Sequence, residues 1–221
     1  LAQAVDEEVV LTYDDALGTK DRDNHGTKLA GLALYGDLKR QLGLDEPFKI
    51  THAIESVKIL DMNRQVEPSL YGDITKQAID RAYIAKPKQN RIFCSGVTAE
   101  SAEITDGLPT SWSAALDEVI SHADDPESDH ELVLVSSGNI FIDMLNGTVY
   151  PDANENRSVR SPGQSWNALT VGAYSENVLI EERDILATGY APAAMPGELC
   201  PFSTTSLQWQ HSIAPVKPEI V

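Results

Sequence analysis

The fold of this chain is most visible in one stretch, Glu131-Leu-Val-Leu-Val-Ser-Ser-Gly-Asn139. A short apolar run that is closed by Ser-Gly-Asn is typical of a buried strand that ends in a tight turn. The turn puts the carboxamide of Asn139 just beyond the C-terminal end of the strand. Because ligand sites of parallel sheets form beyond these ends, Asn139 is a candidate site residue.

Further elements alternate on both sides of this strand. Apolar runs predict strands at 55–60, 91–97 and 168–174, and apolar residues at helical spacing predict helices at 71–85 and 110–120. Thr110 offers a side-chain oxygen that can cap the second helix. Strands that alternate with helices predict parallel strands joined by helical crossovers, which is an α/β fold with a mostly parallel sheet. The polar stretch from Asn146 to Arg160 is predicted to be a surface loop.

The composition limits the partners of this protein. Its 221 residues include 34 acidic and 17 basic side chains, which gives a net charge of −17. Such a surface repels nucleic acid and anionic membranes, so neither is an expected partner. No apolar stretch approaches the length of a membrane span. The length is sufficient for one domain with its own core.

The two cysteines, Cys94 and Cys200, lie far apart in the sequence and form no CxxC pair, so a zinc site is not expected. Cys94 lies in an apolar run and is predicted to be a buried free thiol. No basic region followed by an apolar core opens the sequence, so no signal peptide is visible. Together with the sparse cysteines, this favours a cytoplasmic location.

A second group of polar residues lies near the N-terminus, in Asp23-Asn-His-Gly-Thr-Lys-Leu-Ala-Gly31. A histidine before Gly-Thr and small apolar residues predicts the start of a helix, which Thr27 to Leu38 would continue. An imidazole titrates near neutrality, so His25 can accept and return a proton within one catalytic cycle. Taken alone, His25 is better explained as a capping or surface histidine, and Ser-Gly-Asn at 137–139 as a simple turn.

Two acidic residues, Asp21 and Asp23, precede this histidine. A loop residue so close in sequence rarely reaches the far nitrogen of the imidazole, so both are predicted to be solvated carboxylates. The segment also resembles the start of a calcium-binding loop. Position 12 of that loop would be Leu32 instead of a bidentate glutamate, so we expect no calcium here.

Several motifs, in one order across nearly the whole chain, resemble those of the subtilisin-like serine proteases. They are His-Gly-Thr-x-x-Ala-Gly at 25–31, Val-Lys-Ile-Leu at 57–60, the strand and Ser-Gly-Asn at 133–139, the segment ending Val-Gly-Ala at 161–173, Phe-Ser at 202–203 and Lys-Pro-Glu-Ile-Val at 217–221. The resemblance implies a three-layer α/β fold, with a mostly parallel sheet and helices on both faces. It also implies hydrolysis of peptide bonds by an Asp-His-Ser triad, with His25 as the general base and Asn139 as the oxyanion donor.

The same resemblance implies peptide or protein substrates that bind as an extended strand in a groove. The residues expected to line that groove are Ser95, Gly96, Val97, Ser136, Ser137 and Gly138. The small side chains at 136–138 would leave room for a large apolar substrate side chain. Relatives often bind calcium, but no calcium site is identified in this sequence, and no cofactor is expected.

Two motifs of that family cannot be found in residues 1–221. They are the Asp-Thr-Gly or Asp-Ser-Gly that precedes the histidine and the Gly-Thr-Ser-x-Ala-x-Pro of the nucleophile, and Ser137, Ser161, Ser203 and Ser206 lack its strand-to-helix context. We therefore expect a single subtilisin-like domain over residues 1–221, truncated at both ends and inactive alone. Truncation would expose sheet edges and favour self-association. The alternative is a non-catalytic pseudoprotease or peptide-binding module.

Overall fold

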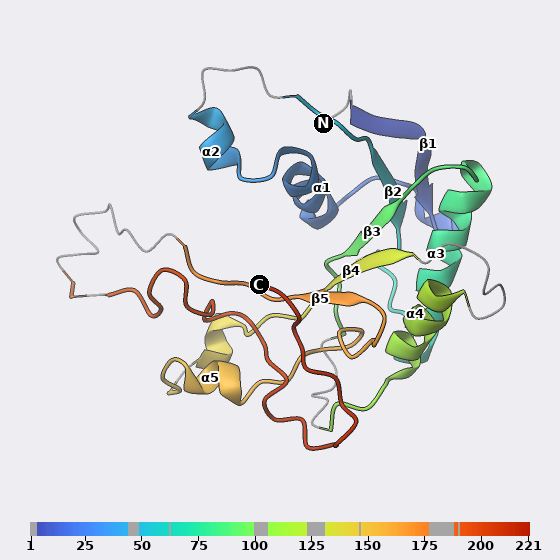
Figure 1. The fold of residues 1–221 in the computed structure, drawn as a ribbon. Coiled ribbons are helices and arrows are strands. Elements are labelled where there is room, and N and C mark those ends of the chain that lie inside the picture. The colour runs from blue at the N-terminus through green and yellow to red at the C-terminus, as the bar shows by residue number, and fades with distance from the viewer. Residues whose placement is uncertain are drawn as a thin grey trace. The chain divides into compact units, whose positions relative to one another are not determined.

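The computed structural model describes residues 4–43, 49–61, 63–99, 106–122, 131–145, 147–176, 188–189 and 191–221. The chain divides into two compact units, Leu1–Asn90 and Arg91–Val221 (Figure 1). We refer to them as the first and the second unit and describe each by itself. The single domain expected from the sequence stays a prediction.

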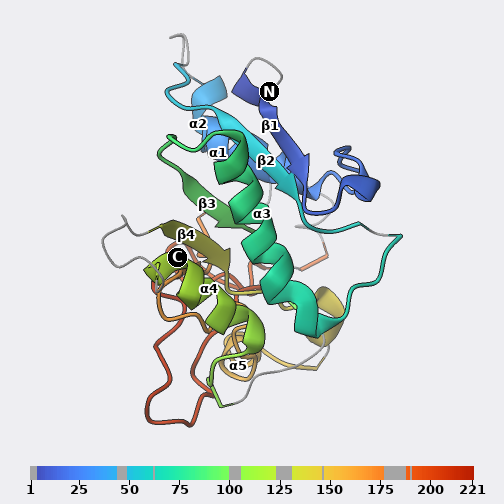
Figure 2. The ribbon, with the colours of Figure 1, turned by 90° about the vertical axis from the view of Figure 1, so that its right-hand side faces the viewer.

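The first unit is built on a parallel pair of strands, β1 (Val5–Thr12) and β2 (Ile54–Lys58). Its helices are α1 (His25–Tyr35), α2 (Leu38–Leu42) and α3 (Tyr71–Ala85). Figures 1 and 2 show α1 and α3 on opposite faces of this sheet. The side chains buried in this unit include Val9, Leu34, Ile74, Ala78, Ile79 and Ala82. Helix α3 begins and ends at the predicted residues, because its apolar side chains recur at helical spacing and pack on both strands.

Helix α1 is shorter than the sequence led us to expect. It ends at Tyr35, and Gly36 follows with a φ of 61° while its N–H donates to the Leu32 carbonyl at 2.8 Å. Glycine reaches this left-handed region without steric cost and so terminates helices. The Asp37 carboxylate then accepts from the Arg40 N–H at 3.2 Å and starts α2. The prediction that one helix continues to Leu38 is therefore wrong.

The second unit contains a three-stranded parallel sheet in the order β3 (Ile92–Ser95), β4 (Leu132–Ser136) and β5 (Leu169–Val171). Helices α4 (Ser111–Ser121) and α5 (Asp152–Glu155) follow β3 and β4 along the chain. All three strands fall within the predicted ranges. The predicted cap of α4 is also confirmed: Thr110 Oγ1 accepts from the Ser113 N–H at 3.1 Å, and Ser113 Oγ accepts from the Thr110 N–H at 2.8 Å.

Cys94 is exposed, which contradicts the predicted buried thiol. Within the described residues β3 pairs only with β4, so it is an edge strand of its sheet. Side chains two positions apart share one face of a strand, and Ile92, on the same face as Cys94, is 66% exposed. An apolar run predicts burial only if another layer covers that face.

The stretch from Asn146 to Arg160, predicted to be a surface loop, contributes to the core of the second unit. Its buried residues include Ala153, Asn154, Val159 and Arg160. Val159 N–H donates to the Thr205 carbonyl at 3.0 Å, and both Asn154 amide hydrogens are used by carbonyls of the segment 200–203. These bonds pair the Val159 N–H and the Asn154 side-chain N–H groups, which would otherwise favour exposure of the segment to water.

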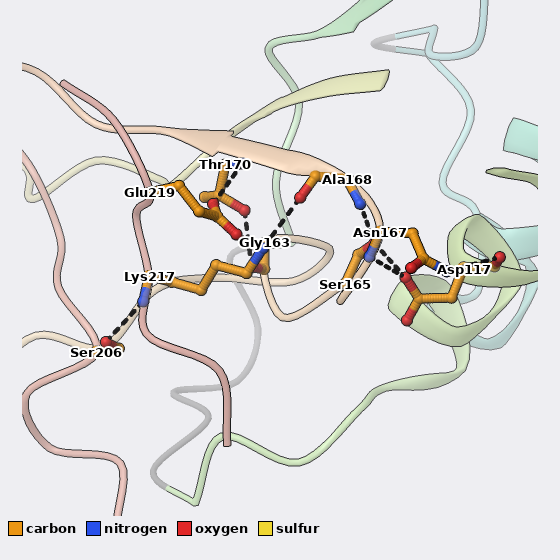
Figure 3. A network of polar contacts seen from close by, with 9 residues as sticks. All are labelled: Asp117, Gly163, Ser165, Asn167, Ala168, Thr170, Ser206, Lys217 and Glu219. Atoms are coloured by element: carbon orange, nitrogen blue, oxygen red, sulfur yellow. Dashed lines mark hydrogen bonds and ion pairs between the residues drawn. The ribbon is translucent and has the colours of Figure 1, made fainter. Parts of the chain in front are cut away.

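The C-terminal segment lies beside β5 and is held there by a buried lysine (Figure 3). Lys217 Nζ donates to the Ala168 carbonyl at 3.0 Å and forms an ion pair with the Glu219 carboxylate. The second carboxylate oxygen of Glu219 accepts from the Thr170 N–H at 2.8 Å. A charge as deeply buried as that of Lys217 needs such partners, and they fix the position of residues 217–219 along β5.

Within the described residues, no helix is both long enough and apolar enough to cross a bilayer.

Candidate active site

His25 is the first residue of α1 and is exposed. The preceding residue, Asn24, has a φ of 62° and makes no capping bond with its side chain. The start of the helix is instead held by a residue further upstream. The sequence correctly places the histidine at a helix N-terminus, although the group that caps this helix was not recognised.

That group is the carboxylate of Asp21. One of its oxygens accepts from the N–H groups of Asp23 at 3.1 Å and Asn24 at 2.9 Å, and the other from the Thr27 N–H at 2.8 Å and Thr27 Oγ1 at 2.6 Å. The Thr27 hydroxyl, followed by its N–H, lowers the pKa of Asp21 to about 2. Asp21 is partly exposed, in keeping with the predicted solvated carboxylate, but the sequence did not reveal that its carboxylate closes the loop on which His25 stands.

Asn139 follows β4 after a turn through Gly138, whose φ is 103°. The turn is anchored on its far side, where Ile140 N–H donates to the Phe202 carbonyl at 2.8 Å. The Asn139 side chain is exposed and makes no hydrogen bond with another described residue. A carboxamide on a fixed backbone, with its N–H donors unused, can stabilise negative charge on a substrate oxygen.

The predicted groove residues 136–138 form a tightly held edge. Ser137 N–H donates to the Val171 carbonyl of β5 at 3.0 Å. The Ser137 carbonyl accepts from the Arg160 N–H at 2.9 Å and from Thr204 Oγ1 at 2.7 Å. Ser136 Oγ accepts from the Gly138 N–H at 3.1 Å. These bonds fix the backbone that leads into Asn139.

The predicted groove residues 95–97 continue from β3, the strand next to β4. Ser95 lies opposite Val135 in the parallel register, so both segments leave the sheet at the same C-terminal edge. Just beyond them, Ala99 N–H donates to the Ser161 carbonyl at 2.8 Å. The structure thus brings both predicted groove segments and Asn139 together in the second unit, whereas His25 belongs to the first.

Sequence reasoning missed Arg160, whose side chain packs against Gly138. A Cβ on Gly138 would lie 2.9 Å from both Cγ and Cδ of Arg160. Only the Pro-Gly turn that follows, at 162–163, marks this part of the chain as more than a polar loop. No cluster of three or more His, Cys, Asp or Glu side chains that could hold a metal ion is present in the ranges that the structure describes.

Parallel strands joined by helices define an α/β protein, and ligand sites of such proteins lie beyond the C-terminal ends of the strands. A model of the Subtilase family matches residues 3–221, and the chain therefore belongs to the subtilase family of serine peptidases. No curated protein and no solved structure matches the chain. The match confirms the resemblance and the subtilisin-like α/β fold class. It also establishes, for the family, hydrolysis of peptide or protein substrates.

Proposed function

We propose that residues 1–221 are the central part of a subtilisin-like serine endopeptidase, in which His25 is the general base and Asn139 the side-chain oxyanion donor. The observation that carries this proposal is the placement of Asn139. Its exposed carboxamide stands on a turn that is fixed on both sides, directly beyond the C-terminal end of β4. A donor that is already oriented needs no reorganisation when charge develops on the substrate carbonyl oxygen.

In this mechanism His25 takes the proton of the nucleophile and returns it to the leaving amine. Asp21 supports the base indirectly, since its carboxylate bonds to the N–H groups of Asp23, Asn24 and Thr27 on both sides of the histidine. These bonds hold the backbone from which the imidazole projects. The Asp21 carboxylate is accordingly a positioning group and not the aspartate of the triad.

The triad aspartate and the nucleophilic serine would come from segments outside residues 1–221, because this sequence holds neither of their motifs. Residues 1–221 alone are then inactive, since no acyl-enzyme can form without a nucleophile. The same missing motifs favour one second candidate, a pseudoprotease or peptide-binding module that uses the groove at 95–97 and 136–138 without cleavage.

The test uses the full-length protein with its natural flanking sequence and a fluorogenic peptide substrate. We expect Asn139→Ala to lower kcat by about 10²–10³ with little change in KM, a magnitude taken from the corresponding asparagine of subtilisin itself. Asn63→Ala, at an exposed asparagine in the first unit, is the matched control and should keep full activity. Unchanged turnover in Asn139→Ala would refute the oxyanion role. Peptide binding without cleavage by the unaltered protein would favour the binding module.

A further inference from the structure

We propose that an acidic substrate side chain binds beside residues 136–138, at a position that we call the acidic subsite, and that Arg160 recognises its carboxylate. This inference rests on the proposed peptide-binding function and names its substrate class. It replaces the large apolar side chain that the small residues at 136–138 led us to expect, because that expectation took no account of Arg160.

Arg160 lies at the point where the two groove segments are joined. Its own N–H donates to the Ser137 carbonyl at 2.9 Å, and the next residue, Ser161, accepts from the Ala99 N–H at 2.8 Å. The aliphatic part of the Arg160 side chain packs on Gly138, directly before Asn139. Any substrate side chain that enters beside residues 136–138 therefore meets the side chain of Arg160.

Arg160 is a buried residue, and no carboxylate of the described residues pairs with its guanidinium. The residue is only 9% exposed, and its guanidinium lies 5.5 Å from the centre of the Phe141 ring. Its hydrogen-bond partner is Met144 Sδ at 3.9 Å, which is a weak acceptor. Although the chain has 34 acidic residues, none of those that the structure describes forms an ion pair with Arg160. A buried cation without an anion is costly, so this arrangement favours the binding of one.

Arg64 in the first unit shows what the missing partner would be. Its guanidinium also lies over an aromatic ring, that of Tyr13 at 5.9 Å, and there the Asp14 carboxylate completes the arrangement with an ion pair. At Arg160 the aromatic ring is present and the carboxylate is not. A guanidinium presents its N–H donors in a planar fork that matches a carboxylate, so a glutamate or aspartate side chain of the substrate fits this position.

The experiment compares three peptides that differ at one position only, the residue that binds at the acidic subsite beside residues 136–138. That residue is Glu, Gln or Leu. With the full-length protein, kcat/KM for the Glu peptide should exceed that for the Gln peptide by about 10- to 100-fold. Arg160→Met keeps the aliphatic contact with Gly138 and should bring this ratio to about one while the Leu peptide is still cleaved. Arg160→Lys should restore part of the preference. Arg40→Gln removes the same charge from an exposed site on α2 and should leave the ratio unchanged.

Two kinetic outcomes would overturn the inference and leave the peptidase function in place. One is a Glu-to-Gln ratio near one in the unaltered protein. The other is an equal loss of activity toward all three peptides in Arg160→Met, which would make Arg160 a purely structural residue.

Binding of the same peptides, measured by fluorescence anisotropy, separates the two proposals if nothing is cleaved. A preference for the Glu peptide that disappears in Arg160→Met would support recognition of an acidic side chain at the acidic subsite, and it would refute the peptidase function. Equal binding of the Glu and Gln peptides, or no binding, would also refute the proposal of an acidic subsite at Arg160.

Discussion

Removal of the Glu219 carboxylate is expected to destabilise the second unit strongly, because it leaves a buried ammonium without its counter-charge. The Lys217 side chain is 0% exposed, and the Glu219 carboxylate is its ion-pair partner (Figure 3). Glu219→Ala would also remove the acceptor of the Thr170 N–H, which is bonded at 2.8 Å. Among the described residues, only the Ala168 carbonyl, at 3.0 Å from Lys217 Nζ, would remain to solvate the charge.

The loss of one member of a buried ion pair costs about 3–5 kcal/mol. The Glu219 side chain is 33% exposed, so water can enter where it is removed. We therefore expect a loss at or below the lower limit of this range, about 2–3 kcal/mol. Lys217→Met combined with Glu219→Ala removes both charges and should cost less than the sum of the two single changes.

Urea unfolding followed by tryptophan fluorescence measures this effect. The three tryptophans of the chain, Trp112, Trp166 and Trp209, all belong to the second unit, so the signal reports on that unit. With a slope of about 2 kcal/mol per molar urea, the midpoint should fall by about 1–1.5 M. A loss below about 1 kcal/mol, or single changes that simply add, would refute the interpretation of Lys217 as a buried charge that depends on Glu219.

Two further predictions concern the loops around the candidate site. The pKa of Asp21 is about 2, below the value of about 3.9 for an unfolded aspartate, so the stability it contributes is present above about pH 4 and is lost as the pH falls toward 2. Circular dichroism during an acid titration should show this loss in the unaltered protein and in the control Asp23→Asn, and a smaller one in Asp21→Asn. Gly138→Ala should lower stability by about 1–3 kcal/mol, because φ is 103° and the new Cβ would lie 2.9 Å from the Arg160 side chain. Gly197→Ala, at a φ of 85° with open space around it, measures the backbone strain alone, and equal losses in the two variants would show that the contact with Arg160 does not matter.

Local patterns in the sequence predicted the elements that depend on local physics. Helix α3 was predicted from its first to its last residue, because the spacing of Ile74, Ala78 and Ala82 selects one buried face. The cap of α4 at Thr110 was predicted from the chemistry of its side chain. The strands β3, β4 and β5 were predicted from apolar runs between turn residues, whereas β1 (Val5–Thr12) was not predicted. The family followed from the order of the motifs along the chain.

Burial and partner choice were predicted less well. The exposure of Cys94 depends on whether another layer covers β3, which its own neighbours in the sequence do not reveal. Helix α1 ends early because Gly36 adopts a positive φ instead of a helical backbone conformation. The bonds of Asp21 to Thr27 were not predicted, because they exist only once the loop between the two residues has closed.

The sequence by itself determined the family, helix α3, the cap of α4 and the strands β3 to β5. It also placed His25 at the start of a helix and Asn139 just beyond the end of a strand. Periodicity, caps and turns act between residues that are neighbours along the chain, so these features are visible in the sequence. The tertiary structure alone decided what surrounds them. Arg160 lies in a polar stretch that was predicted to be a surface loop. It is buried against Gly138, and its N–H donates to the carbonyl of the distant Ser137. Burial is a property of the whole packed chain, so no local pattern could place that charge beside the groove.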